Sequence, residues 1–109
     1  MDYIKKLPKI ELHCHLDGSI SKATMEELLG REVDGSLLSV SGDCTSLTEY
    51  LQKFDLPLSA LTSYSAFKKA AKDFVLNLQA DNVIYAEVRF APLLSVSESL
   101  RTRDIMEAV

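Results

Sequence analysis

Two segments of strand-forming residues, at 9–16 and 83–90, lie on either side of a long helical pattern at 63–79, and this order constrains the fold most strongly. The apolar side of the helix is formed by residues at helical spacing: Phe67, Ala71, Phe74 and Leu78, with Ala70 and Val75 beside them. Strand, helix and strand in this order form a βαβ unit, in which the two strands are parallel. Since the chain has no internal repeat and no linker, the sequence predicts a single α/β unit.

A shorter helix is predicted directly after the first strand. Ser21 is a suitable N-cap, because its hydroxyl can accept a hydrogen bond from a backbone amide of the first turn, and Gly30 is a suitable end. The residues expected to be buried are Met25, Leu28 and Leu29. Residues 31–45 are rich in Ser, Gly and Asp and are predicted to form a loop.

A second short helix is predicted to begin after Ser46. Ser46 and Glu49 form a capping-box sequence, in which each side chain accepts a hydrogen bond from the backbone amide of the other. This helix is expected to end before Pro57. Its apolar residues, at i, i+3, i+4 and i+7, are Leu47, Tyr50, Leu51 and Phe54. From spacing alone, such a face indicates packing against a core.

His13 and His15 are the only two histidines of the chain, and both lie in the first predicted strand. Alternate residues of a strand point to the same face, so two imidazoles about 7 Å apart along it can converge on one metal ion. Imidazole suits zinc, cobalt, nickel or iron, and the spacing does not choose among them. Cys14 is expected to point to the opposite face, toward the core. The alternative is that both histidines are partly exposed and bond to backbone or water.

Asp17 and Gly18 follow the first strand and are typical of a tight turn, in which Gly18 is expected to allow a positive φ. Asp17 is also a candidate functional residue, because barrel enzymes keep their sites just past the C-terminal ends of the strands.

Three segments resemble adenosine deaminases, the zinc aminohydrolases of the amidohydrolase superfamily. Residues 7–19 (LPKIELHCHLDGS) are similar to the opening of that family, residues 47–55 (LTEYLQKFD) to its helix over the substrate mouth, and residues 82–92 (NVIYAEVRFAP) to its second barrel strand. Adenine-specific relatives tend to carry Ile-Glu-Gly where this chain has Leu-Asp-Gly at 16–18, which favours a nucleoside over the free base.

The resemblance implies a (β/α)8 TIM barrel, which needs about 250 residues, whereas this chain has 109. We therefore expect residues 1–109 to form one incomplete domain, the N-terminal part of such a barrel with two parallel strands plus helices. A helical apolar pattern that runs from Leu100 to Val109 agrees with this expectation. Because two parallel strands leave open edges, the chain is expected to be completed by self-association or by a C-terminal part.

The activity implied by the resemblance is hydrolytic deamination of adenosine or deoxyadenosine to inosine or deoxyinosine, by water activated on one Zn²⁺ per complete active site. His13 and His15 would be metal ligands. The family's other ligands and its acid–base residues would lie further along a full-length chain, so no catalytic residue is expected here and the chain alone is expected to be inactive. The implied substrate-binding residues are His15, Asp17 at the ribose 5′-hydroxyl, and a lid of Leu47, Tyr50, Leu51 and Phe54.

Two other functions stay open at this point. One is a related amidohydrolase that acts on another adenine-nucleoside derivative. Asp17 distinguishes nucleosides from nucleotides as substrates, because a 5′-phosphate is unfavourable beside a carboxylate. The other is a non-catalytic assembly or interaction module. Glu87 and Arg89, on one face of the second strand, are expected to form a structural ion pair or hydrogen-bond network rather than to act in catalysis.

The composition of the chain argues against several classes of protein. The net charge is −4 and no segment carries a basic stripe, which argues against a nucleic-acid partner. No segment has the pattern of a signal peptide or a membrane span. Cys14 and Cys44 are expected to be free thiols in a reducing compartment, which predicts a cytoplasmic location. The H-x-E and P-C-x-x-C motifs of deaminases that act on bases in nucleic acid do not occur.

Overall fold

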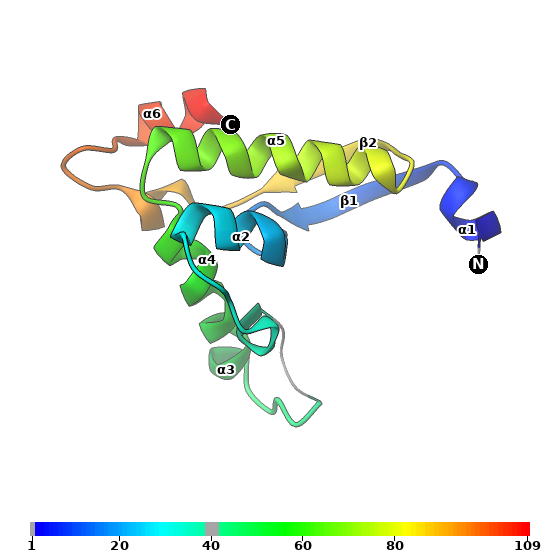
Figure 1. The fold of residues 1–109 in the computed structure, drawn as a ribbon, viewed down its shortest axis with the longest axis horizontal. Helices are drawn as coiled ribbons and strands as arrows, with labels where there is room; N and C mark the ends of the chain where they lie inside the picture. The colour runs from blue at the N-terminus through cyan, green and yellow to red at the C-terminus, as the bar shows by residue number, and fades with distance from the viewer. Residues whose placement is uncertain (1, 39–41) are drawn as a thin grey trace.

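The two strands expected from the sequence pair in parallel in the computed structural model, which describes residues 2–38 and 42–109. Strand β1 (Lys9–His15) lies beside β2 (Val83–Arg89) in a two-stranded sheet, which confirms the predicted α/β unit. The helical elements are α1 (Asp2–Lys6), α2 (Lys22–Leu29), η1 (Gly35–Leu38), α3 (Leu47–Leu51), η2 (Gln52–Phe54), α4 (Asp55–Ala60), α5 (Tyr64–Ala80), η3 (Pro92–Ser95) and α6 (Thr102–Ala108). In Figure 1, α5 runs along the strand pair while α3 and α4 project away from it.

The register of the sheet is not continuous. A shift directly after Lys9 gives β2 one additional residue, and a shift between Glu11 and Cys14 gives β1 one additional residue. The strict alternation predicted for residues 9–16 is therefore interrupted. The pairing ends with His15 opposite Arg89, so the C-terminal ends of both strands lie at the same edge of the sheet.

The boundaries of the two longer helices follow from local capping. The Ser21 hydroxyl caps α2, and Gly30 ends that helix in the left-handed region, with φ 68°. The Ser63 hydroxyl caps α5 in the same way. The chain leaves α5 through Asn82, whose φ is 60°. Both helices thus lie where the sequence predicts them. The loop predicted at 31–45 contains η1, and its residues 39–41 lie outside the described part of the chain.

The helical segment after Ser46 differs from its prediction. The Ser46 hydroxyl accepts a hydrogen bond from the Glu49 amide at 3.1 Å, as expected. The Glu49 carboxylate, however, accepts from the Thr45 amide at 3.4 Å, so the reciprocal half of the capping box is wrong. The segment also continues through α3, η2 and α4 instead of ending before Pro57. Pro57 is the third residue of α4, in the first turn, where a backbone N–H has no partner within the helix, so proline is tolerated.

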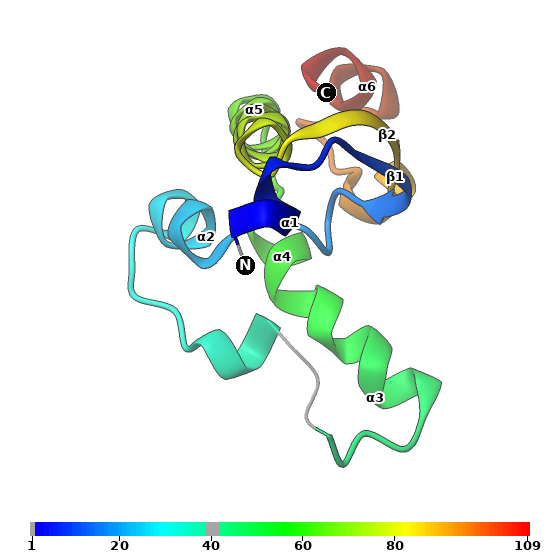
Figure 2. The same ribbon diagram turned by 90° about the vertical axis from the view of Figure 1, so that its right-hand side faces the viewer.

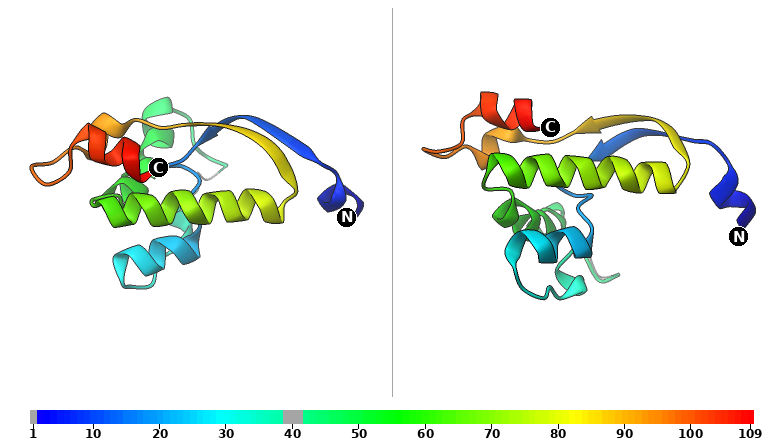
Figure 3. Two further views of the ribbon diagram at one scale, coloured as in Figure 1. Left: turned by 90° about the horizontal axis from the view of Figure 1, so that it is seen from above. Right: turned by 45° about the horizontal axis from the view of Figure 1, so that its top comes forward.

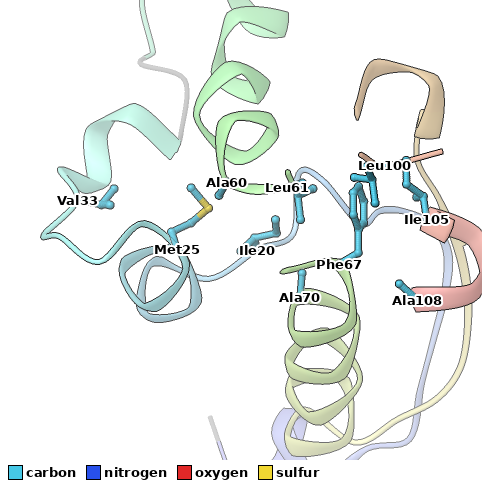
Figure 4. Packing of buried hydrophobic residues seen from close by; sticks show 10 residues of the cluster. All are labelled: Ile20, Met25, Val33, Ala60, Leu61, Phe67, Ala70, Leu100, Ile105 and Ala108. Atoms are coloured by element: carbon cyan, nitrogen blue, oxygen red, sulfur yellow. The ribbon is translucent and has the colours of Figure 1, made fainter. Parts of the chain in front are cut away.

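The hydrophobic core lies between α2, α4, α5 and α6, as Figure 4 shows, and Phe67 of α5 is completely buried in it. The other buried members are Ile20, Met25, Val33, Ala60, Leu61, Ala70, Leu100, Ile105 and Ala108. Burying a large apolar side chain contributes about 1.5–3 kcal/mol, so this cluster is a main source of the stability of the fold. Val75, predicted to widen the buried stripe of α5, is instead 60% exposed.

Within residues 2–38 and 42–109, no helix covers one of the two faces of the sheet. Figure 2 shows α5 beside one face of the strand pair and no described helix against the other, and the two views in Figure 3 agree. Large apolar side chains are exposed on both strands and on α5: Ile10 and Leu12 of β1, Ile84 of β2, and Val75 and Leu76 of α5. Among the helices of the described part, none is long and apolar enough to cross a membrane.

Candidate metal and nucleoside site

The two histidines converge at the C-terminal end of β1. Their Nε2 atoms lie 3.0 Å apart, and the ring centroids lie 5.0 Å apart with the planes tilted by 47°. Both imidazoles are exposed. Cys14 does not join them: it is partly buried and its Sγ lies 3.2 Å from the Ser19 hydroxyl. The rotamers of the pair therefore aim two nitrogens at one point in front of the strand.

This geometry fits a divalent metal ion. Two nitrogens bound to one tetrahedral zinc at about 2.0–2.1 Å lie roughly 3.3 Å apart, close to the observed separation. Metal binding through Nε2 requires the ring proton to be on Nδ1, and the Nδ1 of His15 faces the Asp17 carboxylate at 3.9 Å, beyond hydrogen-bond distance. Without a metal, the same separation allows one imidazole to donate a hydrogen bond to the other. Within residues 2–38 and 42–109, no cluster of three or more His, Cys, Asp and Glu side chains could hold a metal.

Asp17 is a buried carboxylate directly behind this pair. It is 5% exposed, and its Oδ1 atom has no hydrogen-bond partner among the described residues. Burial raises the pKa of the Asp17 carboxyl above its ordinary value, while His15 and nearby backbone amides partly oppose that shift. A buried oxygen without a partner is costly, so a hydrogen-bond donor beside it would lower that cost.

Gly18 lies under the ring of Phe54. This close contact, and not a positive φ, explains why a residue without a side chain suits position 18. Of the described glycines only Gly30 has a positive φ, so the expectation that Gly18 needs one is wrong. A Cβ on Gly18 would instead lie 2.8 Å from Cε1 of Phe54. The ring also packs edge-on against His15, with centroids 5.9 Å apart. Phe54 thus joins the α3–η2–α4 segment to the histidine pair.

A cavity of about 570 Å³ opens beside these residues. Four of the sequence-predicted residues line it: His15, Asp17, Leu51 and Phe54. Its remaining lining comes from Asp55, Leu58, Arg89, Phe90, Ala91 and Leu94. The α3–η2–α4 segment therefore contributes three apolar side chains and one carboxylate, that of Asp55, while His15, Asp17 and Arg89 contribute polar groups at the ends of the two strands.

The other predicted residues lie elsewhere. Tyr50 packs edge-on against Phe54, with centroids 6.1 Å apart, and lines a smaller neighbouring cavity of about 250 Å³. Leu47 is 71% exposed and is not part of the 570 Å³ cavity. His13 reaches the site through its contact with His15 and does not line that cavity either.

Sequence reasoning missed the wall formed after β2. Phe90, Ala91 and Leu94 follow the C-terminal end of that strand, which is the same position that marks Asp17 after β1. The rule that functional residues follow the ends of parallel strands could have found them. Glu87 and Arg89 form no ion pair with each other among the described contacts: Glu87 accepts from the Tyr85 hydroxyl at 3.0 Å, and Arg89 donates to the Leu12 carbonyl at 3.4 Å.

Comparison with known proteins decides the family. The sequence model described as adenosine deaminase matches residues 8–109. The chain belongs to the adenosine deaminase family. It is similar to the adenosine deaminase of Clostridium botulinum (strain 657 / Type Ba4), with 41% identity over 96% of this chain and 35% of the relative. It is also similar to the adenosine deaminase of Haemophilus ducreyi, with 39% identity over 91% of this chain and 32% of the relative.

Solved structures agree with this membership. The chain is similar to Arabidopsis ADAL complexed with GMP, with a TM-score of 0.76 and 32% identity over 99% of this chain and 34% of that one. The Arabidopsis N6-mAMP deaminase MAPDA is similar at a TM-score of 0.76 and 33% identity, with the same coverage. The chain thus spans about a third of the length of the relatives that it matches. Deaminases of this family are generally metal-dependent hydrolases, in agreement with the converging imidazoles.

Proposed function

We propose that residues 1–109 form an incomplete domain that supplies the metal-binding N-terminal part of a hydrolase, and that this hydrolase converts adenosine or deoxyadenosine to inosine or deoxyinosine. The observation that carries the proposal is the pair of Nε2 atoms 3.0 Å apart, next to a buried carboxylate on the wall of a cavity of about 570 Å³. That volume suits a small-molecule ligand.

His13 and His15 would hold Zn²⁺ through their Nε2 atoms. A zinc ion bound there supplies a water of lowered pKa, which makes hydroxide available near neutral pH. Binding through Nε2 would leave the ring proton of each imidazole on Nδ1. For the reaction itself further ligands and acid–base groups are needed, so we propose that the chain alone does not turn over and that it works with the remaining two thirds of a barrel.

Asp17 would bind the ribose. Asp17 lines the cavity, and its Oδ1 atom is buried without a partner, so a 5′-hydroxyl that donates to this carboxylate would offset the cost of an unpaired buried acceptor. Leu51 and Phe54 would cover the nucleoside and exclude water, since both line the cavity from the α3–η2–α4 segment. Tyr50 and Leu47, on the same segment but outside the cavity, would complete the outer part of this lid.

A second candidate is a nucleotide deaminase. The likeness to ADAL with GMP and to the N6-mAMP deaminase favours it, and Arg89 places one cation in the cavity lining, where a phosphate would need one. The buried Asp17 carboxylate opposes it, because an anionic phosphate beside an ionised carboxylate is unfavourable. We therefore prefer the nucleoside.

The test is a chimera in which residues 1–109 replace the matching third of the Clostridium botulinum adenosine deaminase. We expect bound zinc, conversion of adenosine to inosine, and a much lower kcat/KM for AMP and N6-methyl-AMP. His15→Ala should remove both zinc and turnover. Asp17→Asn should raise the KM for adenosine, while Asp55→Asn, the same change at the exposed aspartate of the cavity lining, should not.

Other outcomes would assign a different function. A chimera that prefers the nucleotides would support the second candidate. A folded chimera that binds neither zinc nor purine, and that His15→Ala leaves unchanged, would support the non-catalytic module instead.

A further inference from the structure

Strand β1 carries one additional residue between Glu11 and Cys14, in the stretch that contains the first histidine of the pair. Glu11 pairs with Ala86 and Cys14 pairs with Val88, so three steps along β1 face two steps along β2. The extra stretch comprises Leu12 and His13. An additional residue of this kind is a β-bulge, which bends the strand and changes the direction of a side chain, and bulges are frequent beside active sites.

Side chains satisfy the backbone groups of the bulge. The amide of His13 donates to Oε1 of Glu11 at 3.1 Å. The carbonyl of Leu12 accepts from Nη2 of Arg89 at 3.4 Å. Both bonds are exposed, so each contributes modestly, but together they hold the amide of His13 and the carbonyl of Leu12 in the irregular backbone from which the His13 side chain extends.

The bulge has a consequence for the imidazoles. Residues i and i+2 of a regular strand lie on one face, about 7 Å apart along the backbone, and the Nε2 atoms of His13 and His15 are 3.0 Å apart. Side-chain rotamers bring the two rings together, and the bulge determines the backbone position from which the His13 side chain extends. We propose that Glu11 and Arg89 are positioning residues of the metal site: through the His13 amide and the Leu12 carbonyl they hold the bulge that turns His13 toward His15. The inference rests on the proposed metal function of that pair.

A simpler effect must be separated from positioning. The Glu11 carboxylate carries a negative charge near the imidazoles, and such a charge attracts any cation. Glu11→Gln removes the charge but keeps an oxygen that can accept from the His13 amide, and Glu11→Ala removes both. Positioning predicts that Gln behaves like Glu, whereas simple attraction predicts that Gln behaves like Ala.

The experiment measures two quantities on the chimera with the Clostridium botulinum adenosine deaminase, in which the remaining two thirds of the barrel are present: the affinity for Co²⁺ from its visible absorption spectrum, and hydrogen exchange at the His13 amide. We expect Glu11→Ala to speed exchange at His13 and to weaken Co²⁺ binding about tenfold, as is typical for partners of metal ligands. Glu11→Gln should stay near wild type in both. Arg89→Met should weaken Co²⁺ binding and Arg89→Lys should largely restore it. Glu87→Ala is the matched control, because that carboxylate bonds Tyr85 and does not touch the bulge.

Three outcomes are decisive. If Glu11→Ala speeds His13 exchange and leaves Co²⁺ affinity unchanged, the positioning role is wrong. If Glu11→Gln weakens Co²⁺ binding as much as Glu11→Ala does, charge and not positioning is responsible, and the inference is again wrong. If wild type and His15→Ala bind Co²⁺ equally poorly, the proposed metal site fails, and the inference falls with it.

Discussion

Gly18→Ala is the substitution whose cost follows most directly from the structure. The new Cβ would lie 2.8 Å from Cε1 and 3.1 Å from Cζ of Phe54. Carbon atoms in contact normally lie about 3.5–4.0 Å apart, so the ring has to retreat by roughly 0.7–1.2 Å. Phe54 is only half-buried and can move, but the movement opens its edge contact with His15.

The contact between the rings of Phe54 and His15 determines the expected loss of stability. An aromatic pair contributes about 0.5–1.5 kcal/mol, so we expect Gly18→Ala to lower the free energy of unfolding by about 1 kcal/mol. For a chain of this size that corresponds to a fall in Tm of about 4–8 °C, measurable by far-UV circular dichroism. Gly35→Ala is the matched control, because a Cβ added there would meet nothing within 4 Å and the φ of Gly35 is not positive.

A double-mutant cycle tests the cause. Leucine at position 54 lacks the ring edge that meets Gly18, so Gly18→Ala should cost almost nothing in a Phe54→Leu background. The reasoning is refuted if Gly18→Ala lowers Tm equally in both backgrounds, or if it leaves Tm unchanged in the wild type.

The other predictions concern the core, one ion pair and the uncovered face. Thr24 and Lys69 donate to Asp73 and hold the pKa of that carboxyl below its usual range. Its contribution to stability is therefore present above the ordinary carboxyl pKa and is lost as the pH falls through the lowered pKa, so Asp73→Asn should lower Tm at about pH 7 and match wild type in strong acid. Phe67→Ala should cost about 3–5 kcal/mol and abolish the cooperative thermal transition; a retained transition near the wild-type Tm would contradict the central place of Phe67 in the core. Leu12→Lys, at a side chain that is 59% exposed, should leave Tm within a few degrees while shifting sedimentation toward the monomer, and an unchanged sedimentation profile would argue against self-association through this face.

The sequence predicts those features that short stretches of chain determine. The ends of α2 depend on Ser21 and Gly30, and the parallel pairing depends on the order of strand and helix. The prediction that a helix ends before Pro57 is wrong because the effect of a proline depends on its position within a helix, and that position is fixed by how α3, η2 and α4 join.

In the candidate site, too, local sequence patterns predict some residues, and contacts between distant parts of the chain determine the others. The histidine pair is visible at a spacing of two, and Asp17 follows its strand directly. The contact between Gly18 and Phe54 joins residues far apart in sequence, so no local pattern shows it. Helical spacing places Val75 in the core, but the surface that would cover it does not lie within the described residues.

The parallel pairing of β1 with β2 also orders events while the protein is being made. Arg89 and the Leu12 carbonyl that it bonds are 77 residues apart in sequence. During synthesis from the N-terminus, β1 therefore emerges long before the strand that it pairs with, and contacts of such separation form slowly. Until β2 arrives, the nascent chain has two histidines and a free thiol on a strand with no partner.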